Sequence, residues 1–297
     1  MQFYKATIKL NSPLATLLKG DTIWGHIVWG IANHEGDEAV KKFLDESKSA
    51  EPPLIVSSAF PKDSICKPYP KHVDRKENLS KKDYAQIKAS KKQKYVSTSD
   101  FFTGAEQKEE FKGLKKVSSM HNGINRFSNT VEEGNLFSST ELWALPKEPD
   151  FDVYLLSSYS AERVKQLLDW AFENGFGADS STGKGAISVE KIQKVEVQEK
   201  KSNKYVALAP FVLEKSDIKE DSLRADIFVR TGKIGGTFAT YMTPYKKTVI
   251  LFDEGAVFES DKPIEFVGKL LTDIHADPRI CQAGFAPVVP FLEAEEE

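Results

Sequence analysis

The hydrophobic and polar positions of the first sixty residues change from one period to another. Residues 2–10 (QFYKATIKL) alternate residue by residue, which predicts a β-strand with Phe3, Lys5, Thr7 and Lys9 on one face. After a break at residues 12–13, apolar residues recur at helical spacing and predict a helix with one core-facing stripe. The stripe consists of Ile23, Trp24, Ile27, Val28 and Ile31.

The next two elements follow from caps and breaks. Asp21 or Thr22 is expected to cap the first helix. A second, shorter helix is predicted from Asp37 to Ser47. Two prolines then end that unit, and the apolar run from Leu54 to Phe60 predicts a buried strand.

Regular patterning stops at Pro61 and resumes after Arg126. This stretch holds lysines, polar residues and scattered aromatics, so we expect an insertion with one helix near Lys81 to Lys94. A helix capped by Ser160 follows two further strands and precedes another strand. These elements are expected at Leu136–Leu145, Phe151–Ser157, Ala161–Glu173 and Ala186–Val197.

Without the insertion, the order of elements is strand, helix, strand, strand, helix, strand. This is the order of a ferredoxin-like (RRM-like, split βαβ) unit. The sequence therefore predicts an α+β protein, with a ferredoxin-like domain over residues 1–200 and a large basic insertion in it at about 61–135. Residues 201–297 are expected to form a second, mostly β and degenerate ferredoxin-like domain. Its predicted strands are Tyr205–Ala209, Leu223–Arg230, Thr248–Phe258 and Arg279–Val289.

Composition adds little to this picture, because 40% hydrophobic and 29% charged residues are ordinary for a globular protein. Apolar runs stay well below the roughly 20 residues that span a bilayer, and the N-terminus lacks the pattern of a secretory signal. Cys66 and Cys281 lie far apart, without metal-binding or redox spacing. We therefore expect a cytoplasmic protein that has no membrane partner.

Charge is distributed less evenly than the formal net charge of −3 suggests. Residues 62–94 contain eleven Lys or Arg and four Asp or Glu. Such a patch can attract phosphates at short range, since screening limits its reach to about 8 Å. A solvated insertion without a binding role explains the same composition.

The segment from Gly175 to Gly185 carries the clearest chemical signal. It holds four glycines in eleven residues, with hydroxyls and one lysine between them. Glycines let the backbone adopt positive φ, and successive free N–H groups form a concavity suited to phosphate oxygens. The expected donors are Ser180, Ser181, Thr182 and Lys184. The segment is not a Walker A motif, because Ala178 stands at the first glycine position and Gly185 follows the lysine.

Two further clusters combine glycine, basic and aromatic or amide residues. The first spans residues 231–237 and includes Gly235 and Gly236, with Tyr245, Lys246 and Lys247 after it. It suits backbone clamping and base stacking on single-stranded nucleic acid, or a hairpin with surface tyrosines.

The other cluster spans residues 121–127. Arg126 offers a planar fork for phosphate, and Asn122 and Asn125 can contact a base or ribose. A turn that closes the basic insertion is an equally good interpretation.

No catalytic or cofactor-binding constellation is found in the sequence. The five histidines show no zinc-binding spacing, and no nucleophile elbow is present. We interpret His26 as a packed or interface histidine. His121 could activate a ribose 2′-OH, but the sequence supplies no partner acid beside it.

Several of these segments, taken in order, resemble the RAMP superfamily of CRISPR proteins. The similarity is strongest to the subunit of the type III-A (Csm) effector complex that caps the 5′ end of the CRISPR RNA (crRNA). It covers nearly the whole chain except residues 71–120. The residues that carry it are Ser12-Pro13-Leu14, Lys19 to His26, Phe60-Pro61, Lys67-Pro68, Asn125-Arg126, Gly134 to Phe137, Gly175 to Gly185, Gly235-Gly236 and Gly284-Phe285.

The resemblance implies a non-catalytic subunit that binds the crRNA 5′ tag, and flanking target RNA, through a glycine-rich loop. It implies a thumb-like hairpin within residues 95–137, and contacts with the large polymerase-like subunit and the repeating backbone RAMP subunit. The chain departs from the family pattern at Asn125, where an Asp commonly precedes the Arg, and at residues 178–181. The RNA-binding residues expected from the clusters and the resemblance are Lys19, Asn122, Asn125, Arg126, Gly175, Gly177, Ser180, Ser181, Thr182, Gly183, Lys184, Gly185, Gly235, Gly236, Tyr245, Lys246 and Lys247.

Two alternatives remain at this point. One is a metal-independent endoribonuclease of the same superfamily, in which His26 or His121 would act as acid or base while Lys184 stabilises the transition state. The other is a protein-binding scaffold whose glycine-rich loop packs on another subunit.

Overall fold

The computed structural model describes residues 1–70, 84, 88, 92–103, 111, 113–146, 148–196, 202–214, 218–235, 240 and 243–292, without the side chains of 132 and 133. Helices and strands are mixed along the chain, which confirms the predicted α+β class. Most of the predicted helix near Lys81 to Lys94, most of the basic patch and Gly236 lie outside the described residues. Among the described residues, no helix combines the length and apolar character needed to cross a bilayer.

The first half of the chain forms a four-stranded antiparallel sheet in the order β2-β7-β1-β8. Helix α1 contacts strand β2, the short helix α2 and the second long helix, α5, which also contacts β8. All of these elements were predicted, and wherever a bound was predicted it lies within three residues of the one observed; the end of α1 was not predicted. Their bounds are β1 Gln2–Leu10, α1 Gly20–Glu35, α2 Asp37–Ser47, β2 Leu54–Pro61, β7 Asp150–Ser157, α5 Ala161–Phe172 and β8 Ile187–Lys194.

The two long helices begin differently. The hydroxyl of Ser160 accepts the amide of Arg163 at 3.3 Å, so the predicted cap of α5 is confirmed. Helix α1 begins one residue before the expected cap, with Lys19 in the N-cap position and no side-chain cap. The expected cap residue Asp21 instead accepts two hydrogen bonds at 2.8 Å from the guanidinium of Arg230.

The second half of the chain forms a four-stranded antiparallel sheet in the order β12-β9-β14-β13, and a separate pair of strands, β10 and β11. Three strand predictions are confirmed in part, and β13 was missed. The predicted strand from Thr248 to Phe258 is two strands, because the chain turns at residues 253–255 with Gly255 at φ 90°. The bounds are β9 Lys204–Ala207, β10 Ile227–Arg230, β11 Val249–Phe252, β12 Val257–Glu259, β13 Phe266–Leu271 and β14 Gln282–Pro290.

One hydrophobic core joins the two halves. The indole of Trp24 on α1 lies 5.7 Å, centroid to centroid, from both Phe43 on α2 and Phe285 on β14. Val206 and Val289 of the second sheet belong to the same buried cluster as Ile8 of the first. The division of the chain at residue 200 stays a prediction, and the core continues across it.

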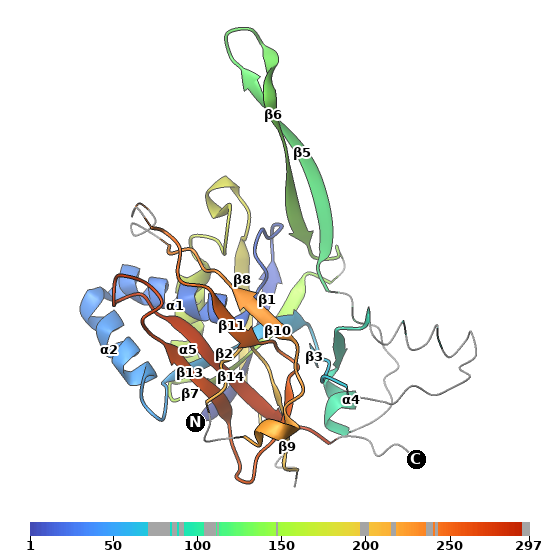
Figure 1. Cartoon of the computed structure of the whole chain (residues 1–297), viewed down its shortest axis with the longest axis vertical. Helices are drawn as coiled ribbons and strands as arrows, with labels where there is room; N and C mark the ends of the chain where they lie inside the picture. Colours follow the sequence, from blue (N-terminus) through green and yellow to red (C-terminus); the bar gives the residue numbers. More distant parts are fainter. Residues whose placement is uncertain are drawn as a thin grey trace.

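A long hairpin projects from one end of the body (Figure 1). Its strands are β5 (Lys115–Asn125) and β6 (Thr130–Trp143), and its base is joined to the body by two backbone hydrogen bonds between Leu14 and Leu142. The strand predicted at Leu136–Leu145 therefore begins earlier, and its partner β5 was not predicted. Most described hairpin residues are exposed, so neither face has to be apolar and the sequence alternates weakly. A second small pair, β3 (Ser64–Cys66) and β4 (Tyr95–Ser97), leads into the short helix α4 (Thr98–Thr103).

Candidate nucleic-acid interface

The glycine-rich loop from Gly175 to Gly185 connects α5 to β8 in a defined conformation. Its four glycines have φ between 74° and 89°, and Asp179 has φ 59°. A Cβ at position 185 would lie 2.2 Å from the carbonyl oxygen of Phe176, and one at position 177 would lie 2.5 Å from Thr16. Gly177 and Gly185 are thus required by close contacts as well as by φ.

Helix α1 anchors this loop through His26. The ring atom Nε2 accepts the Gly177 amide at 3.1 Å, and the ring packs on Phe176 at 4.7 Å between centroids. Burial lowers the pKa of His26 to about 4, although a bond to the Ala171 backbone opposes the shift. The imidazole is therefore neutral at physiological pH, and its interpretation as a packed histidine is confirmed.

Other hydrogen bonds engage most amides of the loop. Thr16 Oγ1 accepts the Ala178 amide at 3.0 Å, and the Gly185 amide donates to Pro13 at 2.8 Å. In the described part of the chain, the amides of residues 179–181 find no acceptor, and neither do the hydroxyls of Ser180 and Ser181. The hydroxyl of Thr182 donates to the Asp179 carbonyl at 2.9 Å. Among the described residues of the loop, residues 179–181 thus hold amide and hydroxyl donors that are left without an internal acceptor.

Lys184 was also expected to donate to phosphate, but its ammonium already has two partners. Its Nζ lies 3.0 Å from Asp179 Oδ2 and 3.5 Å from Glu141 Oε1 on β6. The hydrogen bond to Asp179 raises the pKa of Lys184. A groove of about 670 Å³ beside the loop is lined by α5, β8 and the loop itself, and it also contains the carboxylates of Asp169 and Glu173.

The second glycine-rich segment folds back on itself next to α1. Lys233 forms a β-bridge with Tyr245, and the Ile234 amide donates to Pro244 at 2.8 Å. A Cβ at Gly235 would lie 2.9 Å from Trp29 Nε1. Trp29 is one turn from His26, so one helix holds both glycine-rich segments, which are separated by about fifty residues in sequence.

The basic and aromatic residues of this segment differ in their surroundings. Lys246 Nζ donates to the Cys281 carbonyl at 2.7 Å, and burial lowers the pKa of this lysine. Lys247 is exposed, and so is 60% of Tyr245. Lys247 and Tyr245 can therefore meet a ligand, whereas the Lys246 ammonium has an internal role.

The third predicted cluster lies at the tip of the hairpin and is not brought to the glycine-rich loop. Eight residues of β5 separate Asn125 from the position that pairs with Glu141, a distance on the order of 25 Å. Asn125 Oδ1 accepts the amides of Phe127 and Ser128 at 2.9 and 3.3 Å, so this side chain shapes the turn. Arg126 and Asn122 are exposed.

The hairpin also exposes large apolar side chains that sequence reasoning missed. Phe127 at the tip is fully exposed, with a relative exposure of 102%. Further exposed residues along the strands are Met120, Ile124, Val131, Leu136, Phe137 and Trp143. So much exposed apolar surface marks a binding site for a partner molecule.

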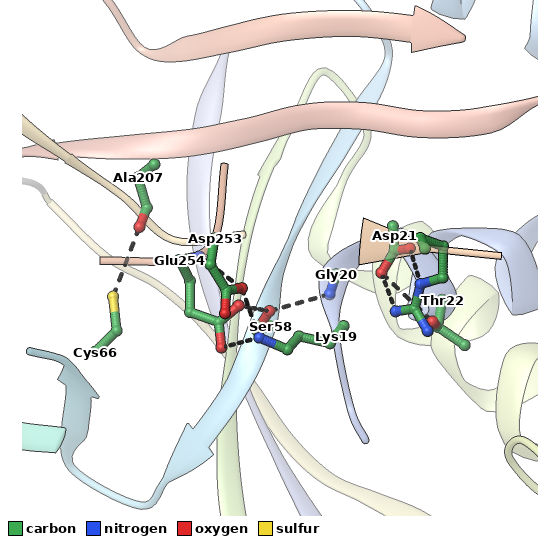
Figure 2. A network of polar contacts seen from close by, with 10 residues as sticks. Lys19, Gly20, Asp21, Thr22, Ser58, Cys66, Ala207, Asp253 and Glu254 are labelled. Carbon is green, nitrogen blue, oxygen red and sulfur yellow. Dashed lines mark hydrogen bonds and ion pairs between the residues drawn. The ribbon is translucent and has the colours of Figure 1, made fainter. Parts of the chain in front are cut away.

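Lys19, the remaining predicted RNA contact, faces the interior, as Figure 2 shows. Its Nζ lies 2.6 Å from both Asp253 Oδ1 and Glu254 Oε1, and Ser58 donates to the other oxygen of Glu254 at 3.1 Å. Burial raises the pKa of Glu254 to about 7, although the Lys19 charge opposes this shift. Lys19 therefore joins α1 to the turn between β11 and β12, which is a structural role that its sequence context did not indicate.

Comparison with known proteins identifies solved structures that share the fold of this chain. No family model and no curated protein matches the sequence. A chain in a crystal structure of a Csm1–Csm4 cassette with AMPPNP superimposes with a TM-score of 0.64 and 14% identity, over 100% of both chains. The same cassette with pppApA gives a TM-score of 0.63 at 14% identity, again over 100% of both chains.

A structure of a Csm3–Csm4 subcomplex in the type III-A CRISPR-Cas interference complex gives a TM-score of 0.57 at 14% identity. That match covers 98% of this chain and 100% of the other. Csm4 is the component named in both kinds of structure. The resemblance found in the sequence is thus confirmed at the level of the fold.

Proposed function

We propose that this chain is a non-catalytic RNA-binding subunit of a type III CRISPR-Cas interference complex and that it holds the 5′ tag of the crRNA. The main support is the glycine-rich loop, in which the amides of residues 179–181 and the hydroxyls of Ser180 and Ser181 have no acceptor within the part of the chain that the structure describes. Backbone amides in this arrangement can donate to the phosphate oxygens of an RNA, whatever its base sequence.

The second glycine-rich segment would extend this contact along the RNA. It lies beside the first on α1, and it exposes Lys247 and Tyr245. Lysine would neutralise a phosphate, and the tyrosine ring would stack on a base.

The β5–β6 hairpin is the proposed thumb. Its tip carries the exposed Phe127 beside Arg126, which suits insertion of an aromatic ring between bases and contact of a guanidinium with a phosphate. We propose that the thumb separates nucleotides at the junction of the tag with the rest of the crRNA or the flanking target RNA.

The partners proposed for the assembly are a large polymerase-like subunit and a repeating backbone RAMP subunit. The structures with this fold contain Csm4 together with Csm1 or with Csm3, which supports a bridging position for this chain. The order β2-β7-β1-β8 also supports a ferredoxin-like first module, and the second sheet is proposed as a degenerate copy.

The first experiment is photo-crosslinking of the full chain to a repeat-derived RNA, followed by mapping of the crosslinked peptides. We expect crosslinks within residues 179–182 and at Tyr245, and weaker ones to an RNA without the tag. RNA bound with no crosslink in either glycine-rich segment would contradict the proposed site. Co-expression with the two partner subunits tests the bridge, since loss of this chain should separate them.

The endoribonuclease alternative has less support from the geometry. His26 is half-buried, its Nε2 accepts the Gly177 amide, and burial holds its pKa at about 4. His121 is exposed but stacks on Phe137 and bonds Ser139 at 2.8 Å, with no carboxylate partner among the described residues. Incubation of repeat RNA with the chain in EDTA decides between them. A single-site product that His121→Ala abolishes would establish the enzyme instead.

A further inference from the structure

The ammonium of Lys184 joins two elements that leave the body at the same end. Asp179, its nearer partner, belongs to the glycine-rich loop, and Glu141 belongs to the hairpin strand β6. The side chains of Lys184 and Glu141 are only 13% and 15% exposed. One ammonium between two carboxylates leaves the cluster with a formal charge of minus one, which does not favour a phosphate.

Glu141 is itself held in place at the base of the hairpin. Its Oε2 accepts the indole N–H of Trp143 at 3.0 Å, which leaves Oε1 directed at Lys184. The neighbouring Leu142 exchanges two backbone hydrogen bonds with Leu14. Glu141 is therefore a fixed point of the hairpin.

We propose that Lys184 is a positioning residue that ties the glycine-rich loop to the β5–β6 hairpin and sets the angle at which the hairpin leaves the body. Its ammonium is not a phosphate ligand. A pivot at the base moves the tip by a large distance, because the tip lies on the order of 25 Å away along the strands. The effect on RNA rests on the proposed function, but the tie itself exists in the RNA-free protein.

A charge swap in the full chain tests the tie without RNA. Lys184→Glu and Glu141→Lys each place like charges together. We expect hydrogen exchange at residues 115–118, 140–143 and 182–185 to accelerate roughly two- to five-fold, as loss of an ion pair near the surface allows. The double variant should recover most of the protection, since the new ammonium at position 141 again lies between two carboxylates.

RNA affinity separates the tie from direct contact. The control is Glu190→Lys, which makes the same charge change at an exposed position on β8. If Lys184 is a tie, Glu141→Lys weakens RNA binding while Glu190→Lys does not, and the double variant binds better than Lys184→Glu.

The opposite set of results overturns the proposal. Unchanged hydrogen exchange in both single variants, with Glu141→Lys binding RNA as tightly as Glu190→Lys, would make Lys184 a direct ligand. If exchange responds as expected but the unmodified chain binds no RNA, the tie stands and the proposed function fails.

Discussion

Lys19 and Lys184 each lie between two carboxylates, one pair in the interior and the other at the surface. Lys19 has Asp253 and Glu254 at 2.6 Å, and its ammonium lies 4.8 Å from the ring of Phe228. Lys184 has looser partners at 3.0 and 3.5 Å.

Burial separates the roles of these two triads. In the interior, an ion without its partner is costly, so the Lys19 triad determines stability. In the Lys184 triad the nearer partner, Asp179, is 52% exposed, so water replaces it when the ion pair is lost and the triad mainly biases geometry. A lysine between two carboxylates thus has a different role in each of the two surroundings.

The strongest test of this difference is removal of the buried lysine. Lys19→Met should lower the free energy of unfolding by about 3–5 kcal/mol at pH 8, because it leaves two carboxylates buried without a counter-charge. Lys184→Met is the matched control and should shift the unfolding midpoint far less. Urea denaturation of both variants measures the effect. Similar losses of unfolding free energy in Lys19→Met and Lys184→Met would show that the two triads do not differ in their effect on stability.

The surface triad of Lys184, Asp179 and Glu141 can also be disrupted by a substitution that changes the backbone conformation of the loop. Gly185→Ala introduces a Cβ 2.2 Å from the Phe176 carbonyl at φ 74°, so the loop must change shape. Gly183→Ala has a similar φ of 89° but open space around its Cβ.

We expect Gly185→Ala to weaken RNA binding strongly. Gly183→Ala should destabilise the loop only by the backbone strain of an alanine at positive φ, about 1 kcal/mol, and should leave the loop shape unchanged. Filter-binding titrations compare them, and equal affinities would mean that the loop shape does not matter.

Above pH 6.5, where His26 is neutral in the folded and the unfolded chain, the pH dependence of stability reports on the buried triad. A carboxyl whose pKa is higher in the fold than in the unfolded chain stabilises the fold below its unfolded pKa, and this contribution is lost as pH rises through the folded pKa. For Glu254 this window runs from 4.5 to about 7. Thermal unfolding between pH 6.5 and 8 should show a decline in stability that Glu254→Gln removes, because below pH 6.5 the depressed pKa of His26 contributes an opposite trend. An identical profile in the variant would assign the decline to other groups.

The sequence predicted those elements whose side chains divide between core and solvent. The stripe of α1 and the alternation of β1 are such elements, since each buries one face. The residue pattern missed strand β5, and only the resemblance implied a hairpin there, because a projecting ribbon buries neither face. The signal that remained was the large number of apolar residues left over, such as Phe127.

The site was predicted as segments, but their arrangement was not. Sequence reasoning found the first glycine-rich segment because positive φ demands glycine, and the second because Gly235 packs too closely on Trp29 to leave room for a Cβ. It gave Lys19, Lys184 and Lys246 the same role, because the partners of Lys19 lie 234 and 235 residues away in sequence and burial is a property of the fold. Only contacts distinguish these three lysines from the exposed Lys247.

The smallest expected effect separates that exposed lysine from Lys184 by their response to salt. Lys247→Ala should make the salt dependence of RNA binding shallower by about 0.7 in log–log slope, the share of one phosphate contact on a single strand. Lys184→Ala should lower affinity without changing the slope, because its charge is already balanced by Asp179 and Glu141. Titrations from low to high salt measure both slopes. A slope change for Lys184→Ala equal to that for Lys247→Ala would place its ammonium on the RNA, and the surface triad would then be a binding site instead of a tie.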